Sequence, residues 1–212
     1  MYDLNKVVES KGAISEIDDI FSSIETEFPL KKGVARQRFS LDQDEKRMCL
    51  ILYSGSCILK RTNDSLVLST IVAPNIVGLQ DVFHSKSDVQ IVASTDIEYR
   101  YISVDDLFLY AENKHLWKSL CYFMMLSTTR FSEYQRETVG ISNYEMICNF
   151  LKSLCHESFE VRATTTALDY IQGRCMLSRS GILKTLSTLK AGGYITIKNG
   201  LLININSLPK RF

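Results

Sequence analysis

Basic and hydroxyl side chains gather on one short segment of this 212-residue chain. Arg179 and Lys184 follow Ser178 and are interleaved with Ser180. The apolar residues of the same segment recur at helical spacing, at Ile182, Leu183, Leu186 and Leu189. An arginine on an exposed helix face can donate two hydrogen bonds to N7 and O6 of guanine, while lysine and serine bind phosphates or neighbouring bases. The segment therefore predicts an amphipathic helix that enters the DNA major groove.

A hairpin is predicted directly after this helix. Ser178 is the expected N-cap, and Gly192 and Gly193 end the helix. Two apolar runs, 194–198 and 201–205, then flank Asn199-Gly200, a dipeptide suited to a type I′ turn because both central residues of that turn need positive φ. We expect a recognition helix followed by a wing, with Lys198 and Asn199 contacting the DNA backbone.

The charge distribution agrees with a polyanion partner for this part of the chain. Residues 140–212 hold nine basic and four acidic residues, whereas residues 1–139 hold 16 and 20. The formal net charge of +1 hides this difference. Double-stranded DNA is therefore the predicted partner of the C-terminal part.

Two further helices are predicted before the recognition helix. Ser142 and Glu145 form a capping box that opens a helix through His156. A second helix is expected at about Thr166–Arg174, with a threonine N-cap and with Leu168 and Ile171 inward. Gly140 breaks the preceding pattern, so we place a winged helix-turn-helix domain at residues 140–212.

A long helix is predicted from about Asn113 to Thr138, because this range lacks Pro and Gly. Its near-heptad positions are Trp117, Leu120, Met124 and Phe131. The apolar segment 120–126 suits a helix that packs its own barrel on one face and a second copy on the other. We therefore expect a dimerisation helix at residues 112–139 and a homodimer; the alternative is a core helix of a single domain.

The first part of the chain is predicted to form a helix at 14–28 followed by short strands. The strands are expected at 46–53, 56–61, 66–72, 76–79, 89–95 and 98–103. Turn signals separate them every eight to twelve residues, which indicates a small antiparallel barrel or jelly roll. Ser103 begins a further helical turn, and the domain is expected to span residues 1–111.

The segment from Leu177 to Ile195 resembles the recognition-helix pattern Ser-Arg-Glu-Thr-Val-x-Arg of the cyclic-AMP receptor protein/FNR family of bacterial regulators. Arg179 matches the guanine-reading arginine of that family, Ser180 replaces a glutamate and Lys184 takes the later basic position. The resemblance implies an α+β fold: an N-terminal antiparallel jelly roll like a cyclic-nucleotide-binding domain, a dimerisation helix and a C-terminal winged helix-turn-helix. It also implies transcription regulation with RNA polymerase as a partner. Met176 stands where the family has a turn glycine.

The sensor half departs from nucleotide-binding members of this family. Those members present Gly-Glu and later Arg-Ser/Thr, whereas this chain has Gly78-Leu-Gln80 and no arginine between Arg61 and Arg100, with Lys86 the only basic residue there. Cyclic nucleotide is therefore not expected. The first cysteine is Cys49, which disfavours an N-terminal iron–sulfur cluster, and His84 and His115 read as loop residues rather than haem ligands. No cofactor or metal is predicted.

Two hypotheses compete for the barrel interior. One is an apolar effector such as a fatty acid, and the other is a filled core that senses nothing and leaves a constitutive DNA-binding dimer. The candidate ligand-binding residues are Leu50, Leu52, Leu59, Leu68, Val77, Val92 and Tyr101. A redox response through one of the six cysteines is a further alternative, although none forms a Cys-x-x-Cys pair and buried thiols are expected.

Other classes of protein fit less well. A metal-dependent enzyme of the cupin type needs His and carboxylate ligands inside a barrel, and the three histidines, His84, His115 and His156, are widely spread. No enzyme activity and no catalytic residue are predicted. A protein-interaction module that uses its winged helix without DNA is disfavoured by Arg179 and the basic excess. Without a long apolar run or a secretory leader, a cytoplasmic protein with no membrane contact is expected.

Overall fold

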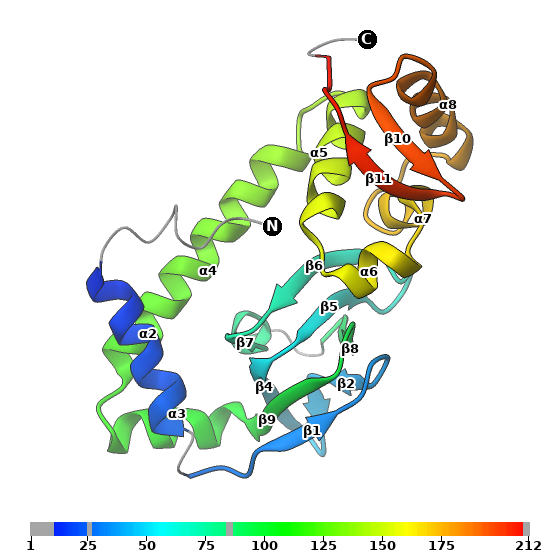
Figure 1. The fold of residues 1–212 in the computed structure, drawn as a ribbon. Coiled ribbons are helices and arrows are strands. Elements are labelled where there is room, and N and C mark those ends of the chain that lie inside the picture. Colours follow the sequence, from blue (N-terminus) through cyan, green and yellow to red (C-terminus); the bar gives the residue numbers. More distant parts are fainter. Residues whose placement is uncertain (1–10, 25–26, 84–86, 210–212) are drawn as a thin grey trace. The chain divides into compact units, whose positions relative to one another are not determined.

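The computed structural model describes residues 11–24, 27–83 and 87–209, apart from the side chains of 11–16 and 81. These residues divide into two compact units. The division lies between Thr128 and Thr129, inside helix α4 (Trp117–Thr138). Figure 1 shows the elements of both units in chain order.

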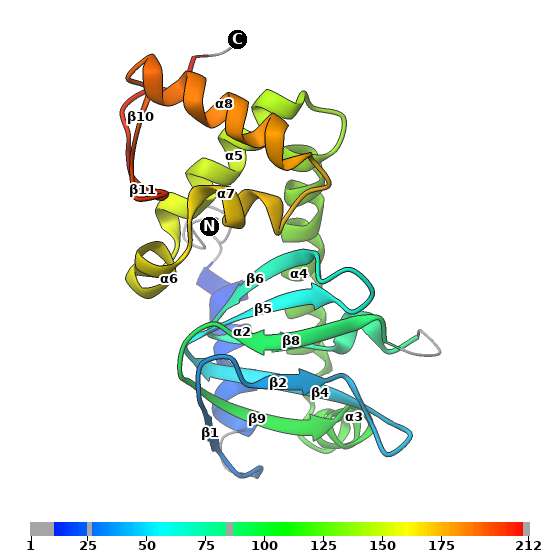
Figure 2. The ribbon, with the colours of Figure 1, turned by 90° about the vertical axis from the view of Figure 1, so that its right-hand side faces the viewer.

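The first unit contains two antiparallel sheets. One has the order β1 (Lys31–Gly33), β9 (Ile97–Ser103), β4 (Lys46–Ser54), β3 (Asp42–Gln43), with β7 (Asn75–Val77) also pairing with β4. The other has the order β2 (Arg38–Ser40), β8 (Val89–Ala93), β5 (Ser56–Arg61), β6 (Val67–Val72). In Figure 2 the strands of this second sheet lie one above another in the order β6, β5, β8, β2, with β9 and β1 below them. Every described strand pair is antiparallel, as the sequence predicts.

The six predicted strands correspond to β4 through β9, with small shifts at their ends. The sequence analysis missed β1, β2 and β3, which are two or three residues long and therefore too short to show an alternating pattern. The predicted strand 76–79 stops at Val77 because Gly78, at φ 114°, turns the chain into the short helix η1 (Leu79–Asp81).

The core between the two sheets contains most of the predicted interior residues. Leu50, Leu52 and Val77 are buried there, and Leu59 and Tyr101 pack against them partly buried. Two predicted interior residues are wrong. Val92 is the neighbour of the inward-facing Ile91 and Ala93 and so points to the other face of β8. Leu68 is the unmatched residue of a bulge between β5 and β6 and lies outside this core.

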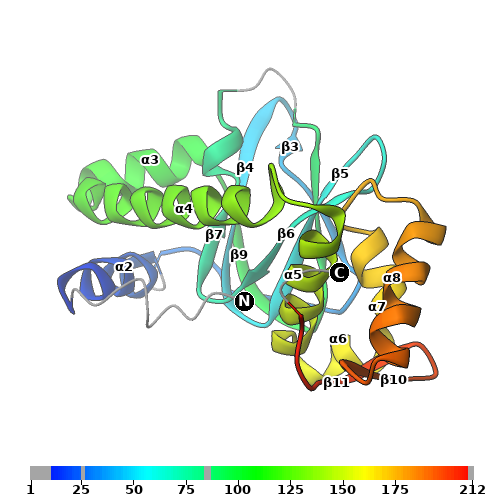
Figure 3. The same ribbon diagram turned by 90° about the horizontal axis from the view of Figure 1, so that it is seen from above.

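Three helices gather on one side of the strands, as Figures 1 and 3 show. They are α2 (Lys11–Ile24), α3 (Val104–Asn113) and the first half of α4. A second core fills the space between these helices and β4, with Ile20, Ile51 and Phe123 among its fully buried members. The predicted helix 14–28 extends too far at its C-terminal end, since Glu27 and Phe28 are not helical. The predicted start at Ser103 is confirmed, because Ser103 Oγ accepts a hydrogen bond from Asp106 N at 3.0 Å.

The predicted helix 113–138 is interrupted at its beginning. α3 ends at Asn113, and His115 adopts a left-handed φ of 56° that no continuous helix can accommodate. Leu116 then packs into the core, and α4 starts at Trp117. The chain therefore turns between α3 and α4, and the helix predicted from Asn113 begins only at Trp117.

The second unit continues with α5 (Asn143–His156), α6 (Phe159–Thr164), α7 (Ala167–Gln172), α8 (Arg179–Ala191), β10 (Ile195–Lys198) and β11 (Leu201–Ile205). The capping box of α5 is confirmed: Ser142 Oγ accepts from Glu145 N, and Ser142 N donates to the Glu145 carboxylate. The core of this second unit brings together Leu151 and Leu154 of α5, Ile171 of α7 and Leu189 of α8. The short helix α6 was not predicted. Within the described residues, no helix is long and apolar enough to cross a membrane.

Candidate nucleic-acid interface

The N-terminal end of α8 is built by its cap. Ser178 Oγ accepts a hydrogen bond from Gly181 N at 3.2 Å, which confirms Ser178 as the N-cap. Ile182, Leu186 and Leu189 are buried and fix the helix on the core. Leu183 was expected on the same apolar face but is 43% exposed. Its position four residues after Arg179 places it on the outward face instead.

The Arg179 side chain is outward and is held at one corner. Its Nη1 donates a hydrogen bond to Gln172 Oε1 at 3.3 Å and lies 4.0 Å from Asp169 Oδ1. The side chain remains 60% exposed. Among the described residues, Nε and Nη2 have no hydrogen-bond partner. These two groups form one edge of the guanidinium, and two parallel donors on one edge match N7 and O6 of guanine.

Ser180 and Lys184 lie on the exposed surface of the same helix. Ser180 Oγ is 3.3 Å from Ser178 Oγ, and Lys184 is exposed. Arg179, Ser180 and Lys184 all lie within the first two turns of α8, so their donors share one end of the helix. This arrangement can donate to base edges and phosphates together.

The wing has the predicted turn. Asn199 and Gly200 adopt φ of 51° and 82°, the positive pair that a type I′ turn requires. Lys198 and Asn199 are exposed at its tip. The tip contacts the start of α7, because Ala167 N donates to Gly200 O at 2.9 Å. Helix α7 therefore contacts Arg179 through its last residue, Gln172, and the wing through its first residue, Ala167.

The turn between α7 and α8 spans residues 173–178. Gly173 is the C-cap of α7 in a right-handed conformation, and Met176 is exposed at 80%. Neither residue supplies a left-handed turn glycine. The first helix of the motif begins at Thr166, whose Oγ1 accepts from Asp169 N at 3.1 Å, and Leu168 and Ile171 are buried as predicted.

A largely buried ion pair links this turn to the end of α5. Arg174 Nη2 lies 3.6 Å from Glu157 Oε1, and the guanidinium stacks at 3.5 Å over the centre of the Tyr170 ring. The Tyr170 hydroxyl donates to Glu157 Oε1 at 2.7 Å. Burial raises the pKa of Tyr170, so the hydroxyl stays a donor at neutral pH. Sequence reasoning missed this group because its members come from three separate elements with no shared motif.

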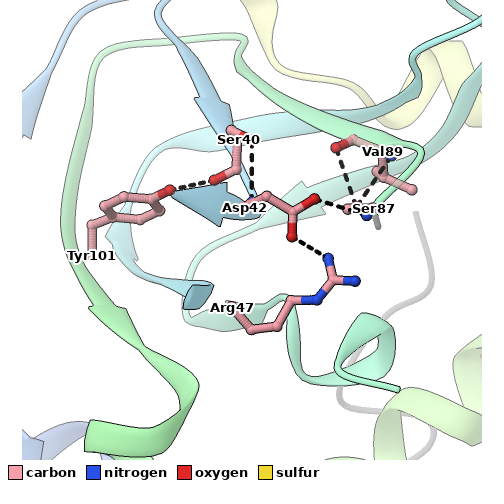
Figure 4. A network of polar contacts seen from close by, with 6 residues as sticks. All are labelled: Ser40, Asp42, Arg47, Ser87, Val89 and Tyr101. Carbon is pink, nitrogen blue, oxygen red and sulfur yellow. Dashed lines mark hydrogen bonds and ion pairs between the residues drawn. The ribbon is translucent and has the colours of Figure 1, made fainter. Parts of the chain in front are cut away.

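A polar network lies at one end of the barrel (Figure 4). The Asp42 carboxylate accepts from the Arg47 guanidinium and from Ser87 N at 2.8 Å. The Tyr101 hydroxyl donates to Ser40 O rather than pointing to a ligand in the interior. Burial raises the pKa of Tyr101 to about 12. Asp42 thus ties the β3–β4 pair to the residues that lead into β8. Lys86 and His84, named in the sequence analysis, lie outside the described residues.

The exposed face of α4 differs from the predicted set of dimer residues. Trp117 and Phe131 are exposed, at 41% and 63%. Leu120 is buried in the core of its own unit, which corrects its expected surface role. Met124 packs against that core but is only partly buried, so its place in a dimer seam stays a prediction. The near-heptad positions do not all lie on the outward face of α4, because Leu120 and Met124 lie on the face that packs against the barrel. The exposed apolar side chains of α4 are Trp117, Tyr122, Met125 and Phe131.

The described cysteines are free thiols and most are buried. Burial raises the pKa of the Cys49 and Cys57 thiols to about 12, and it also raises the pKa of Cys148, Cys155 and Cys175. Cys121, on α4, is the exposed one. No group of His, Cys, Asp or Glu in the described part of the chain is arranged to hold a metal ion.

Comparison with known proteins defines the class. Residues 143–210 match the family model described as winged helix-turn-helix DNA binding. The structure is similar to the c-di-GMP responsive global regulator CLP of Xanthomonas campestris, with a TM-score of 0.70 and 16% identity over 90% of this chain and 100% of that one. It is also similar to a cyclic nucleotide-binding domain containing protein from Listeria monocytogenes, with a TM-score of 0.61 and 14% identity over 89% of this chain and 97% of that one.

These findings confirm the predicted α+β fold: an antiparallel domain like a cyclic-nucleotide-binding domain, followed by a winged helix-turn-helix. Residues 143–210 thus match a winged helix-turn-helix DNA-binding domain, and the chain as a whole has a fold like that of cyclic-nucleotide-binding regulators. Two curated relatives are each named "Inhibitor of hydrogen peroxide resistance". The one from Escherichia coli K12 is 27% identical over 97% of this chain and 99% of its own length. The one from Salmonella typhimurium is 26% identical over 82% of this chain and 89% of its own length.

Proposed function

We propose that this regulator is a homodimer that reads a DNA sequence through α8 and contacts the backbone through its wing, without a cyclic nucleotide. One observation carries the proposal. The guanidinium of Arg179 stands outward at the capped start of α8 with an unoccupied edge, beside the exposed Ser180 and Lys184. A helix start with these donors fits the major groove, where a bidentate arginine distinguishes guanine from other bases.

The dimer part of the proposal is supported by the exposed apolar face of α4. Trp117, Tyr122, Met125 and Phe131 are all more than a third exposed on one helix. Large apolar side chains repeated along a helix are typical of a helix–helix seam. A second copy of the same helix presents the same face, so a two-fold interface can bury both faces.

The barrel interior supports the constitutive alternative over an apolar effector. The interior contains Leu50, Leu52, Cys57 and Ile91, and all four are fully buried. The Phe39 ring packs edge-on against Tyr99 at 4.9 Å. Side chains already in contact leave little room for a fatty acid chain. The lack of arginine from 62 to 99 supports independence from cyclic nucleotides.

The names of the two relatives suggest the process that is controlled. We infer that this chain regulates genes for hydrogen peroxide resistance, a proposal that rests on 26–27% identity over most of the chain. A redox response remains as the alternative within this process. In the described chain Cys121 is the thiol open to an oxidant, because the others are at least partly buried. RNA polymerase stays a predicted partner.

Selection of DNA from a random duplex pool by the full-length protein tests the central proposal. We expect a two-fold symmetric consensus with half-sites about one helical turn apart, since a dimer presents two recognition helices. The selection should succeed without added nucleotide. Recovery of no consensus, or of one that Arg179→Ala recovers unchanged, would contradict the assignment of α8.

A further inference from the structure

Two residues of α7 touch the guanidinium that the proposed function places on a base. Gln172 accepts from Arg179 Nη1 at 3.3 Å, and Asp169 Oδ1 lies 4.0 Å from the same nitrogen. Gln172 is three residues after Asp169, so both side chains leave α7 on one face. They therefore approach Arg179 together from the preceding helix.

Asp169 is itself fixed in position. Its Oδ2 accepts from Thr166 Oγ1 at 2.7 Å, and its backbone N–H donates to the same hydroxyl oxygen. One carboxylate oxygen is thus held by the cap of α7, and the other faces Arg179. A carboxylate held in this way cannot follow the arginine if the arginine moves away.

We infer that Gln172 and Asp169 are positioning residues that set the base specificity of Arg179. This inference rests on the proposed sequence-specific DNA binding. Both contacts use Nη1. Among the described residues none bonds to the edge formed by Nε and Nη2, so this edge is free to face a base. An arginine that is already oriented loses less side-chain freedom when it binds guanine.

Asp169 has a second effect, through its charge. Phosphate oxygens compete with guanine for any arginine near DNA, and contacts to phosphate carry no sequence information. A carboxylate beside Nη1 repels a phosphate that approaches this corner of the guanidinium. Repulsion of the wrong acceptor raises specificity without strengthening the right contact. Asp169 therefore lowers total affinity slightly and raises discrimination.

The test measures discrimination and not affinity alone. The base pair read by Arg179 is first located as the position whose preference Arg179→Ala relaxes in the selected site. Dissociation constants of the full-length protein are then measured for the selected duplex and for one with that pair replaced. Gln172→Ala and Asp169→Asn should each reduce the ratio of the two constants by about three- to tenfold. Asp169→Asn should also bind the replaced duplex at least as tightly as the wild type does.

Three controls separate positioning from structure and from net charge. Glu160→Gln, an exposed change on α6, removes a charge from the same unit and should leave the ratio unchanged. Gln172→Glu keeps an acceptor for Nη1 and should keep the ratio, whereas a purely packing role of Gln172 would give no such rescue. In the Arg179→Ala background, neither α7 variant should change the ratio further.

Each outcome decides the inference. An unchanged ratio in Gln172→Ala and Asp169→Asn, or an equal loss with and without Arg179, would overturn the positioning role while leaving sequence-specific binding intact. A wild-type protein that selects no sequence would remove the proposed function and the positioning role together. A loss in Gln172→Glu as large as in Gln172→Ala would also overturn the role of Gln172 as an acceptor.

Discussion

The backbone N–H of Ala167 donates to the carbonyl oxygen of Gly200 over 2.9 Å, so the tip of the wing is fastened to the first turn of α7. A Cβ on Gly200 would lie 3.0 Å from Thr166 Cγ2, which shows how closely the turn approaches this helix. The wing is therefore fastened to the helix-turn-helix, and the two groups of residues proposed to contact DNA keep one spacing.

Arg179 and Lys198 are expected to contribute differently to binding. Arg179→Ala should cost about 1–3 kcal/mol of specific binding and relax preference at one base pair, because a base contact is lost. Lys198→Ala should weaken binding to all sequences alike and reduce the salt slope by about one unit, because a phosphate contact is lost. Titrations at several salt concentrations measure both effects. The same profile for both variants would contradict the division of roles.

Gly78 should be more sensitive to substitution than another glycine with positive φ. In Gly78→Ala a Cβ would lie 2.5 Å from Met48 O, at a φ of 114°. Gly193→Ala is the matched control, since Gly193 has φ 71° but no atom within 4 Å of a Cβ. Backbone strain alone costs about 1–2 kcal/mol, so Gly193→Ala should lose roughly that and Gly78→Ala more. Denaturant unfolding of both variants gives the comparison, and equal losses would argue against the close approach at Met48.

Charge on the exposed face of α4 should dissociate the proposed dimer. Met125→Glu and Phe131→Glu would each bury an unpaired carboxylate in the seam, which costs several kcal/mol (roughly 3–5). Phe159→Glu is the control, because Phe159 is 79% exposed on α6 and lies outside α4. Sedimentation should give half the mass for the two α4 variants and the wild-type mass for the control. Dimers that persist in both α4 variants would move the interface elsewhere.

Cysteine reactivity should follow burial. Cys121 is expected to react first with an alkylating reagent at pH 8. Cys49 and Cys57, with a pKa of about 12, hold only about one thiolate in ten thousand at that pH. Their folded-state pKa exceeds the usual value of 9.0, so their contribution to stability is present below pH 9 and is lost as the pH rises toward 12. Peptide mass spectrometry after timed labelling measures the order, and early labelling of Cys57 would contradict it.

The barrel should not bind cyclic AMP or cyclic GMP at micromolar concentrations, because no arginine between 62 and 99 can pair with a buried phosphate. If a fatty acid does bind, Leu59→Phe should weaken it, since Leu59 packs against the barrel core. Val92→Phe is the control, since Val92 points away from that core. Calorimetry with both ligand classes decides between the filled core and the apolar effector. Equal weakening by both substitutions would show that the ligand lies outside the barrel.

The parts of the fold that depend on neighbouring residues could be predicted from the sequence. Ser103, Ser142, Thr166 and Ser178 each cap a helix with a hydrogen bond to a residue three positions later, so the signal is local. The Asn199-Gly200 turn is predictable for the same reason. The face of β8 on which Val92 lies could not be predicted, because a run of Val, Ile and Ala does not indicate which residue points inward.

The candidate site could be predicted only in part. Arg179 and Lys184 follow from the pattern of α8, but Gln172 and Asp169 approach Arg179 across the turn between α7 and α8. The Arg174–Glu157 pair joins residues 17 positions apart in the chain, and only the packed structure brings them together. Pairings of this kind depend on tertiary geometry, which residue spacing does not encode.

Helix α4 is also the connection between the two units, so its stiffness matters. Leu120 and Phe123 belong to the core of one unit, and the helix continues past Thr128 into the other without a break. The connection between the two units at this point is therefore a continuous helix and not a flexible linker. The Ser127 and Thr128 hydroxyls donate back to the carbonyls of Phe123 and Met124, at 2.9 Å each, a bond pattern that bends helices. Ser127 and Thr128 therefore mark the turn of α4 at which this helix bends most readily.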